Sequence, residues 1–441
     1  MQPAPAAKCP VCERPVYADS AGFLECACGW GGPGDPAEAA RGLSRAVTLF
    51  DRRMAARIAW RDLKRITENK GATSPRGPLY LLALLALSTL VYLALGALIA
   101  GAIGLMVYYV TDGLWVGVVL DAVVLLYLYT ALFGFPTRSR AIVAPLSAYP
   151  RLEALTREVA GRVKVKPPRW VILVPGANFF ISRRMLWGKA LLPQTVLGVG
   201  VAGLALLSEQ ELRALLAHEL AHHRYAHTLS ALYFGYAERA LHSVISAARQ
   251  GIETNTRGTR GVHGMNDVGL NVGIMLAVVV VWIVTLPLRL LWVTFHLLRL
   301  RISRSHEFQA DAEAVRIYGT ETFINMETGV LAAAATMRGA GEGLLKAMRQ
   351  RDTPNFFAEL RRHYAELPAD YLGEMRMKAT REYRTLLSTH PIMPDRIRAA
   401  LIEAVAAPPS GPTDPAWRVI TPKGAPDPEA IEIELTRRFS R

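Results

Sequence analysis

The sequence predicts a mainly α-helical membrane protein, with transmembrane helices, a helical domain that contains a small β-sheet, and an N-terminal zinc ribbon. Three observations predict this fold class. Hydrophobic residues make up 51% of the 441 residues, and the mean hydropathy is +0.20, which is high for a soluble enzyme. Two apolar stretches are each long enough to cross a bilayer. All four cysteines lie within the first 28 residues, in two close pairs.

The charge balance favours a membrane protein over a nucleic-acid-binding one. The formal net charge is +14, from 51 basic and 37 acidic residues. In a membrane protein such an excess more often reflects lysines and arginines retained on the cytoplasmic side. Residues 1–8 have no apolar core, so we expect no cleavable signal peptide. We therefore expect an integral protein of the inner or plasma membrane.

Residues 1–34 are expected to form the zinc ribbon. Cys9 and Cys12 form one pair, and Cys26 and Cys28 form a second, with one intervening residue where two are usual. Four thiolates in two close pairs suit a tetrahedral structural zinc. Two disulfides are the alternative, which a reducing cytosol disfavours. Such ribbons bind proteins or nucleic acids or serve only to fold, so the ligand of this ribbon stays open.

Residues 35–78 are basic and are expected to lie beside the membrane surface. Residues 79–135 are expected to form a transmembrane hairpin, because 79–110 and 113–135 are apolar runs in which Asp121 is the only charge. Arginines lie before the first run and after the second, which places both ends, and the N-terminus, in the cytoplasm.

Residues 136–406 are expected to contain the catalytic domain, organised around His218-Glu-Leu-Ala-His222. A capping-box pattern at 208–211 predicts that a helix starts there. On that helix the two histidines project from one face, at the spacing that lets two imidazoles hold one zinc ion. Glu219 lies next to the first histidine, where it could take a proton from a zinc-bound water. An ordinary histidine-rich helix is the alternative, since His223 and His227 repeat the spacing without a carboxylate.

Upstream of this helix we expect a strand at 170–174 and another at 195–206. Gly198, Gly200 and Gly203 match the dinucleotide fingerprint, but the acidic residue that should end a second strand lies on the motif helix instead. Glycines in a strand more often let another backbone come close. We therefore expect an edge strand that could pair with an extended substrate.

A catalytic zinc usually keeps three protein ligands, so a third must come from elsewhere in the chain. The best candidates lie in Ser303-Arg-Ser-His-Glu-Phe-Gln-Ala-Asp311, where Glu307 is 85 positions beyond His222. Glu307 and Asp311 share a helical face, so one can bind zinc while the other accepts a hydrogen bond from a ligand histidine. A solvated acidic face with Arg304 as counter-charge is the alternative.

These paired motifs resemble the integral-membrane zinc metallopeptidases that include HtpX and the CAAX prenyl endopeptidase. The segment Gly-Ala-Asn178-Phe-Phe is similar to a loop that the family has upstream of the motif, with Phe179 where alanine is usual. Residues 388–397, Ser-Thr-His-Pro-Ile-Met-Pro-Asp-Arg-Ile, resemble its C-terminal element. The resemblance covers about residues 141–400 and the preceding hairpin, and leaves the ribbon and the basic segment outside.

The resemblance implies a gluzincin-type zinc metalloendopeptidase that acts on protein or peptide substrates, in membrane-protein quality control. The implied ligands of the catalytic zinc are His218, His222 and Glu307. The other implied site residues are Glu219 as the general base, Asp311 and Asn178 behind the ligands, and His390 and Arg396 as groups that stabilise the oxyanion or support the site. With the ribbon, we expect one catalytic and one structural zinc.

The need for His222 and Glu307 to meet at one zinc restricts the membrane topology. The chain between them must cross the bilayer an even number of times. Either 229–249 and 268–286 both cross, or neither does and 268–300 is re-entrant or packed at the surface. We favour four crossings in total, with the active site facing the cytoplasm.

Three functional alternatives stay open. They are a prenyl-protein protease of the same fold, an intramembrane protease, and a non-enzymatic membrane scaffold whose ribbon recruits partners. The polar start of the motif helix disfavours a site inside the bilayer, and the intact Glu219 argues against a scaffold. Residues 407–441 are expected to be a Pro-rich, mobile tail. The oligomeric state stays open.

Overall fold

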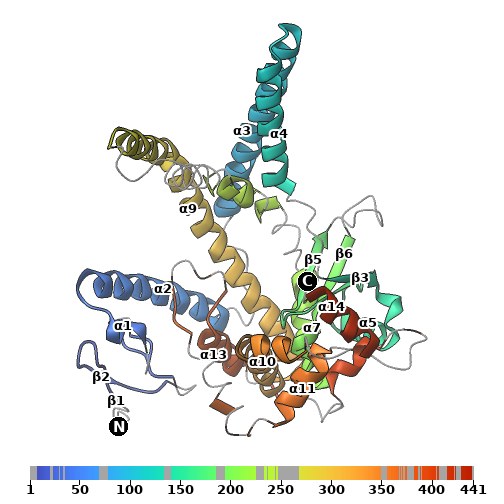
Figure 1. The fold of residues 1–441 in the computed structure, drawn as a ribbon. Coiled ribbons are helices and arrows are strands. Elements are labelled where there is room, and N and C mark those ends of the chain that lie inside the picture. The colour runs from blue at the N-terminus through green and yellow to red at the C-terminus, as the bar shows by residue number, and fades with distance from the viewer. Residues whose placement is uncertain are drawn as a thin grey trace. The chain divides into compact units, whose positions relative to one another are not determined.

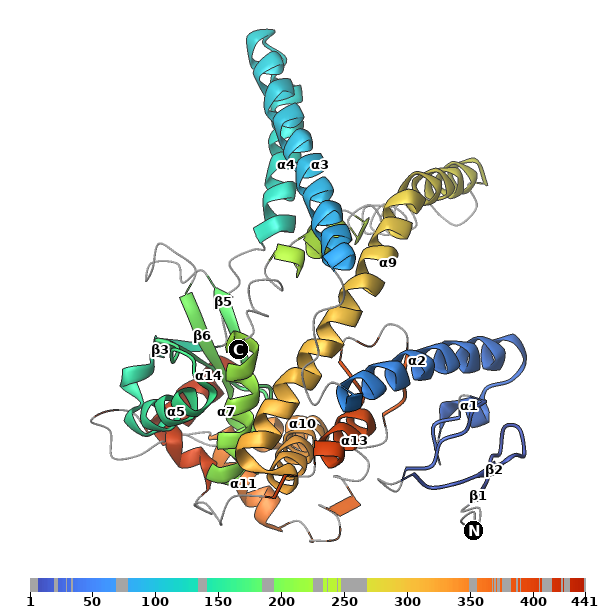
Figure 2. The same ribbon diagram turned by 180° about the vertical axis from the view of Figure 1, so that it is seen from behind.

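The computed structural model divides the chain into two compact units. One contains residues 1–74, 139–228 and 303–441, and the other contains residues 75–138 and 229–302. Figures 1 and 2 show the elements of both. His227, parts of the candidate span 229–249 (229–232, 236, 244 and 247–249) and the start of the expected tail at 407–414 lie outside the described residues. The described residues are 7–19, 23–28, 30–32, 35–68, 78–133, 141–184, 194–224, 233–235, 237–243, 245–246, 268–348, 355–366, 368, 370, 373–374, 382–385, 388, 390–403, 405–406, 415–421, 423 and 429–439.

The second unit contains the expected helical hairpin. Helices α3 (Pro78–Thr111) and α4 (Trp115–Phe133) lie side by side in both views (Figures 1 and 2) and are joined by a turn at Gly113, whose φ is +68°. Among the described residues, one stretch, Leu82–Thr111, is long and apolar enough to cross a membrane. Large apolar side chains along it are exposed, as lipid-facing side chains would be. The number of crossings stays a prediction.

The first unit contains a four-stranded sheet in the order β3-β4-β6-β5. Its strands are β3 (Ile142–Pro145), β4 (Trp170–Val174), β5 (Phe180–Arg184) and β6 (Gln194–Gly200). β4 and β6 are parallel, and the other pairs are antiparallel. Our expectation of a glycine-rich edge strand at 195–206 is wrong in two respects. The strand ends at Gly200, where the short helix α6 (Val201–Leu204) begins, and β6 is paired on both sides.

The glycines of β6 let neighbouring groups approach closely, as the sequence suggested. A Cβ at Gly200 would lie 2.5 Å from the carbonyl carbon of Ala177, and one at Gly198 would lie 2.3 Å from the ring of Phe180. The β4–β5 loop therefore packs directly on β6. In the strand order β5, rather than β6, lies at the sheet edge, and β5 contacts the motif helix α7.

Helices pack around this sheet to form one buried core. The motif helix α7 (Glu209–Arg224) packs against α5 (Pro150–Val163) and α10 (Thr320–Met348). The capping box at its start forms: the Ser208 N–H donates to the Glu211 carboxylate at 2.7 Å, and the Glu211 N–H donates to Ser208 Oγ at 3.3 Å. The C-terminal part of the long helix α9 (Val268–Tyr318) packs into the same core. The core therefore holds both the motif helix α7 and the segment of α9 that contains Glu307.

The end of the chain differs from the expected mobile tail. The 3₁₀ turn η2 (Ala416–Ile420) and helix α14 (Glu429–Phe439) are folded against α5 and α11 (Phe356–Glu366) respectively. Glu432 is fully buried and accepts hydrogen bonds from Arg361 and Asn355. Leu435 is fully buried as well. The prolines therefore precede a docked helix whose partner, α11, could not be recognised from local composition.

The N-terminal residues form a small module followed by a long helix. Strands β1 (Ala7–Lys8) and β2 (Pro15–Val16) pair antiparallel, and α1 (Pro36–Ala39) leads into α2 (Gly42–Glu68). Asp35 forms a buried ion pair with Arg52, which ties the module to α2. Helix α2 also contacts α13 (Met393–Glu403) in the same compact unit.

Candidate metal centre

Helices α7 and α9 bring the three expected ligands together. The Nε2 atoms of His218 and His222 are 3.3 Å apart. One oxygen of Glu307 lies 3.6 Å from His218 Nε2, and the other lies 3.8 Å from His222 Nε2. His218 and Glu307 are buried, while His222 is partly exposed. The 85-residue gap is closed because α9 packs into the core beside α7.

These distances fit a zinc ion. Zinc bonds of about 2.0–2.1 Å in a tetrahedron place the ligand atoms about 3.3–3.4 Å apart. Two imidazole nitrogens and one carboxylate are also the donor set of many catalytic zinc sites with one open position. The three side chains would hold the metal with little rearrangement.

Glu219 lies on the same helix, next to this group, and is held by the sheet edge. The backbone N–H of Ile181, in β5, donates to its carboxylate at 3.1 Å. Burial raises the pKa of Glu219 to about 7, because the positive charge of His218 offsets only part of the lost solvation. A carboxylate with such a pKa can both accept and return a proton near neutral pH.

Behind the ligands lies a buried charge network. Asp311 Oδ1 is 2.9 Å from His218 Nδ1, on the side of the ring away from Glu307. Although burial by itself would lower it, Asp311 raises the pKa of His218 to about 9 in the metal-free chain. Arg396 donates to Asp311 at 2.8 and 2.5 Å and to Glu327, on α10, at 2.6 Å through each of two nitrogens. This network holds His218 in the orientation that points Nε2 at the other ligands.

The network places one residue whose role the sequence left open, Arg396, and one that the sequence analysis missed, Glu327. Arg396 is buried beneath Asp311, so it is placed to support the site rather than to touch a substrate. His218, Asp311 and Glu327 also lie close enough to hold a metal, but the Arg396 guanidinium already pairs with both carboxylates. Sequence reasoning missed Glu327, because nothing in its own helix marks it.

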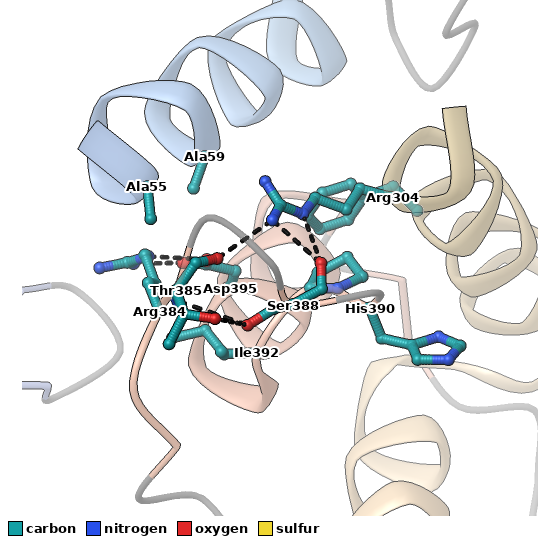
Figure 3. Close-up of a pocket in the computed structure, with 11 residues that line it drawn as sticks. Ala55, Ala59, Arg304, Arg384, Thr385, Ser388, His390, Ile392 and Asp395 are labelled. Atoms are coloured by element: carbon teal, nitrogen blue, oxygen red, sulfur yellow. Dashed lines mark hydrogen bonds and ion pairs between the residues drawn. The ribbon is translucent and has the colours of Figure 1, made fainter. Parts of the chain in front are cut away.

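His390 lies at the open side of the centre. Its Nδ1 is 3.0 Å from Glu307 Oε1, and its side chain is 64% exposed. Its hydrogen bond to Glu307 raises the pKa of His390 above the ordinary value. In Figure 3 its ring points away from α2, while Arg304 reaches the backbone carbonyls of Thr385 and Ser388 in the preceding segment. The segment is thus anchored to α9 one turn before Glu307.

Asn178 is exposed in the β4–β5 loop, and among the described contacts none joins it to the ligands. The loop nevertheless leads into β5 and the amide that holds Glu219. His223 follows the last ligand and is partly buried. Neither residue belongs to the group of ligand atoms.

The profile of Peptidase family M48 matches residues 149–404, which is more than half of the chain. The chain belongs to peptidase family M48. A related sequence, the protease HtpX homolog of Archaeoglobus fulgidus, is 26% identical over 252 residues, covering 56% of this chain and 66% of that protein, just under two thirds of its length. The crystal structure of S. mikatae Ste24p shares 16% identity at a TM-score of 0.30, covering 82% of this chain and 76% of its own. That TM-score is too low for a conclusion about this chain.

The M48 match confirms the family suggested by the motifs, and it encloses every residue of the centre from Asn178 to Arg396. The four cysteines and α2 lie before it.

Proposed function

We propose that this M48 chain is a membrane-bound, zinc-dependent endopeptidase that acts on membrane or misfolded proteins. The observation that carries the proposal is the position of Glu219, a buried carboxylate beside three side chains spaced to hold one zinc. When bound, zinc would polarise the scissile carbonyl and acidify a water molecule. His218, His222 and Glu307 would hold it.

The other groups have separate tasks in the proposed reaction. Glu219 accepts the proton of the attacking water and returns it to the leaving amine. His390, which contacts Glu307 and is otherwise exposed, donates a hydrogen bond to the oxygen on which negative charge develops. Asp311 and Arg396 keep His218 in place. Asn178 is proposed to shape the loop that leads to β5.

Strand β5 supports a peptide substrate. Among the described strands it pairs with β6 along one side only, and its Ile181 N–H reaches Glu219. An extended peptide that adds to the other side would gain main-chain hydrogen bonds and run past the centre. This geometry favours cleavage within a chain of any sequence over recognition of one side chain.

The membrane location is supported by α3 and by the outer face of α2. Leu43, Val47 and Phe50 are exposed on α2, and the exposed Arg57 and Arg61 continue the same face in the second half of the helix. A face that combines apolar and cationic side chains suits an anionic bilayer surface. We propose that this face, like the active site, lies on the cytoplasmic side. A reporter fused at Gly261 would test the number of membrane crossings. A periplasmic signal there would support four crossings, and a cytoplasmic signal would contradict them.

The Glu219→Gln variant tests the enzymatic proposal. It should lose peptide cleavage in purified form while keeping its bound zinc, because the ligands are unchanged. Glu321→Gln, which neutralises an exposed carboxylate on α10, is the matched control and should cleave normally. Cleavage by the Glu219→Gln protein would refute the mechanism. Comparing the proteomes of membranes that contain active protein with those that contain the Glu219→Gln variant would then identify substrates. Prenylated peptides in the cleavage assay would separate a prenyl-protein protease from one that acts on membrane or misfolded proteins.

A further inference from the structure

We propose that residues 7–31 bind a second, structural zinc ion through their four cysteines, and that the loaded module braces the segment carrying His390 and Arg396. The family match begins at residue 149, so it assigns no role to this module. The metal part stands independently of the proposed peptidase activity. The bracing part concerns the candidate metal centre on which the proposed function rests. Hydrogen exchange tests it without any measurement of peptidase activity.

The four thiols are arranged for one metal rather than for disulfides. Cys9 Sγ lies 3.6 Å from Cys28 Sγ, and Cys12 Sγ lies 3.5 Å from Cys26 Sγ. All four sulfurs lie within 4.8 Å of one another, and all four cysteines are free. Tetrahedral zinc with bonds of about 2.3 Å places sulfurs about 3.8 Å apart, whereas a disulfide bond is about 2.05 Å long.

The surroundings of the thiols also suit a metal. The N–H of Val11 points at Cys9 Sγ at 3.4 Å, as backbone amides do around metal thiolates. Cys9, Val16 and Trp30 form a small buried cluster, which is too small to stabilise a module of this size unaided. A structural zinc would supply the missing stability.

The module contacts the catalytic domain through two carboxylates. Asp19 accepts a hydrogen bond from Arg398 Nε at 2.5 Å. Glu25 accepts one from Arg398 Nη2 at 2.8 Å and one from Arg384 Nη1 at 2.5 Å. Both arginines also pair with Asp395, which is 2% exposed. Asp19 and Glu25, which are partly exposed, thus complete a network of two buried arginines and three carboxylates.

This network lies on the elements that carry site residues. Arg398 is on α13, two residues after Arg396, while Arg384 and Asp395 flank the segment that contains His390. Figure 3 shows Arg384 reaching Asp395 on one side of this segment and Arg304 reaching its backbone on the other. The segment is therefore held both from α9 and from the module. Without Asp19 and Glu25, two buried guanidinium groups would share one carboxylate, and the segment would loosen.

Zinc content tests the metal part. The purified protein, prepared under reducing conditions, should contain two zinc ions per chain by elemental analysis, and the Cys12→Ser/Cys26→Ser variant should contain one. If that variant does not fold, thiol labelling of the unaltered chain decides instead. The four thiols should be protected until a chelator is added. Two zinc ions in the variant, or thiols that are disulfide-bonded or react freely before chelation, would overturn the proposal.

Hydrogen exchange tests the bracing part. In the Asp19→Asn/Glu25→Gln variant, both zinc ions should remain, while exchange in residues 382–403 should become about tenfold faster. Glu13→Gln, which removes an exposed carboxylate from the same module, should leave exchange unchanged. With a cleavable peptide, kcat should fall about tenfold with little change in KM, because His390 acts in the transition state. Unchanged exchange would refute the bracing whether or not the chain is a peptidase, and an unchanged kcat alongside faster exchange would show that His390 does not depend on it.

Discussion

Arg396 donates to both oxygens of Asp311, at 2.8 and 2.5 Å, from a position 85 residues further along the chain. Asp311 in turn faces His218 at 2.9 Å. The position of a metal-binding imidazole therefore depends on an arginine that touches neither metal nor substrate.

Replacing Arg396 should destabilise the protein more than any exposed arginine does. In Arg396→Met, Asp311 and Glu327 would be buried without their counter-charge, and breaking a buried ion pair in this way costs about 3–5 kcal/mol. Adding Glu327→Gln should recover part of the loss, because one fewer carboxylate is unpaired. Arg362→Met is the matched control, since Arg362 pairs only at the exposed surface of α11. Thermal unfolding in detergent measures all three, and equal midpoints for Arg396→Met and Arg362→Met would contradict this prediction.

Asp311→Asn should weaken zinc binding at the catalytic centre without removing a ligand. The carboxylate that orients His218 through Nδ1 would become a neutral amide, and losses of about 10–100-fold in metal affinity are usual for such changes. Competition with a calibrated chelator measures the affinity. The control is Asp370→Asn, an exposed aspartate of the same domain. An Asp311→Asn protein that binds zinc as tightly as this control would show that the contact does not orient the ligand.

The affinity of the metal-free catalytic centre for zinc should rise with pH. The pKa of His218 is raised to about 9, so below that pH the ring carries a proton that zinc must displace. Affinity should therefore increase about tenfold per pH unit between pH 7 and 9 and level off above. In Asp311→Asn the slope should shrink, since Asp311 is what raises the pKa. Calorimetric titration in buffers of different ionisation enthalpy counts the released protons, and no proton release at pH 7.5 would be the contrary result.

Gly200→Ala should be strongly destabilising, whereas Gly161→Ala should not. The new Cβ at Gly200 would lie 2.5 Å from Ala177 and 2.6 Å from the carbonyl oxygen of Gly176, both backbone atoms that cannot move without shifting the β4–β5 loop. A Cβ at Gly161, in helix α5, would have no heavy atom within 4 Å apart from the adjoining residues and nearby backbone of its own helix, so alanine there should stabilise the helix by up to about 1 kcal/mol. Unfolding midpoints compare the two, and similar midpoints would mean that the loop does not pack on β6 as described.

The zinc-binding pattern is local, and for that reason it could be found in the sequence. His218, Glu219 and His222 lie within two turns of one helix, whose periodicity sets their common face and whose start is marked by Ser208 and Glu211. The strand at 170–174 and the M48 family could be recognised on similarly local patterns. Even Glu307 can be recognised in the sequence, because Asp311 follows four residues later on the same helical face. The sequence alone does not show that Glu307 lies close to His222 in space.

Other features could not be predicted because they arise from contacts distant in sequence. Glu327 and the pairing of Glu432 with Arg361 have no local pattern, and each is defined only by a residue some 70 positions away. The edge position of β5 depends on the strand order, which a single strand does not contain. By itself the sequence determined which residues can bind zinc and take up a proton, since those properties follow from side-chain chemistry and helical spacing. Only the tertiary structure decided what holds them in place, because the buried charges of Arg396 and Arg398 acquire their partners Asp311 and Asp19 only when distant segments pack together.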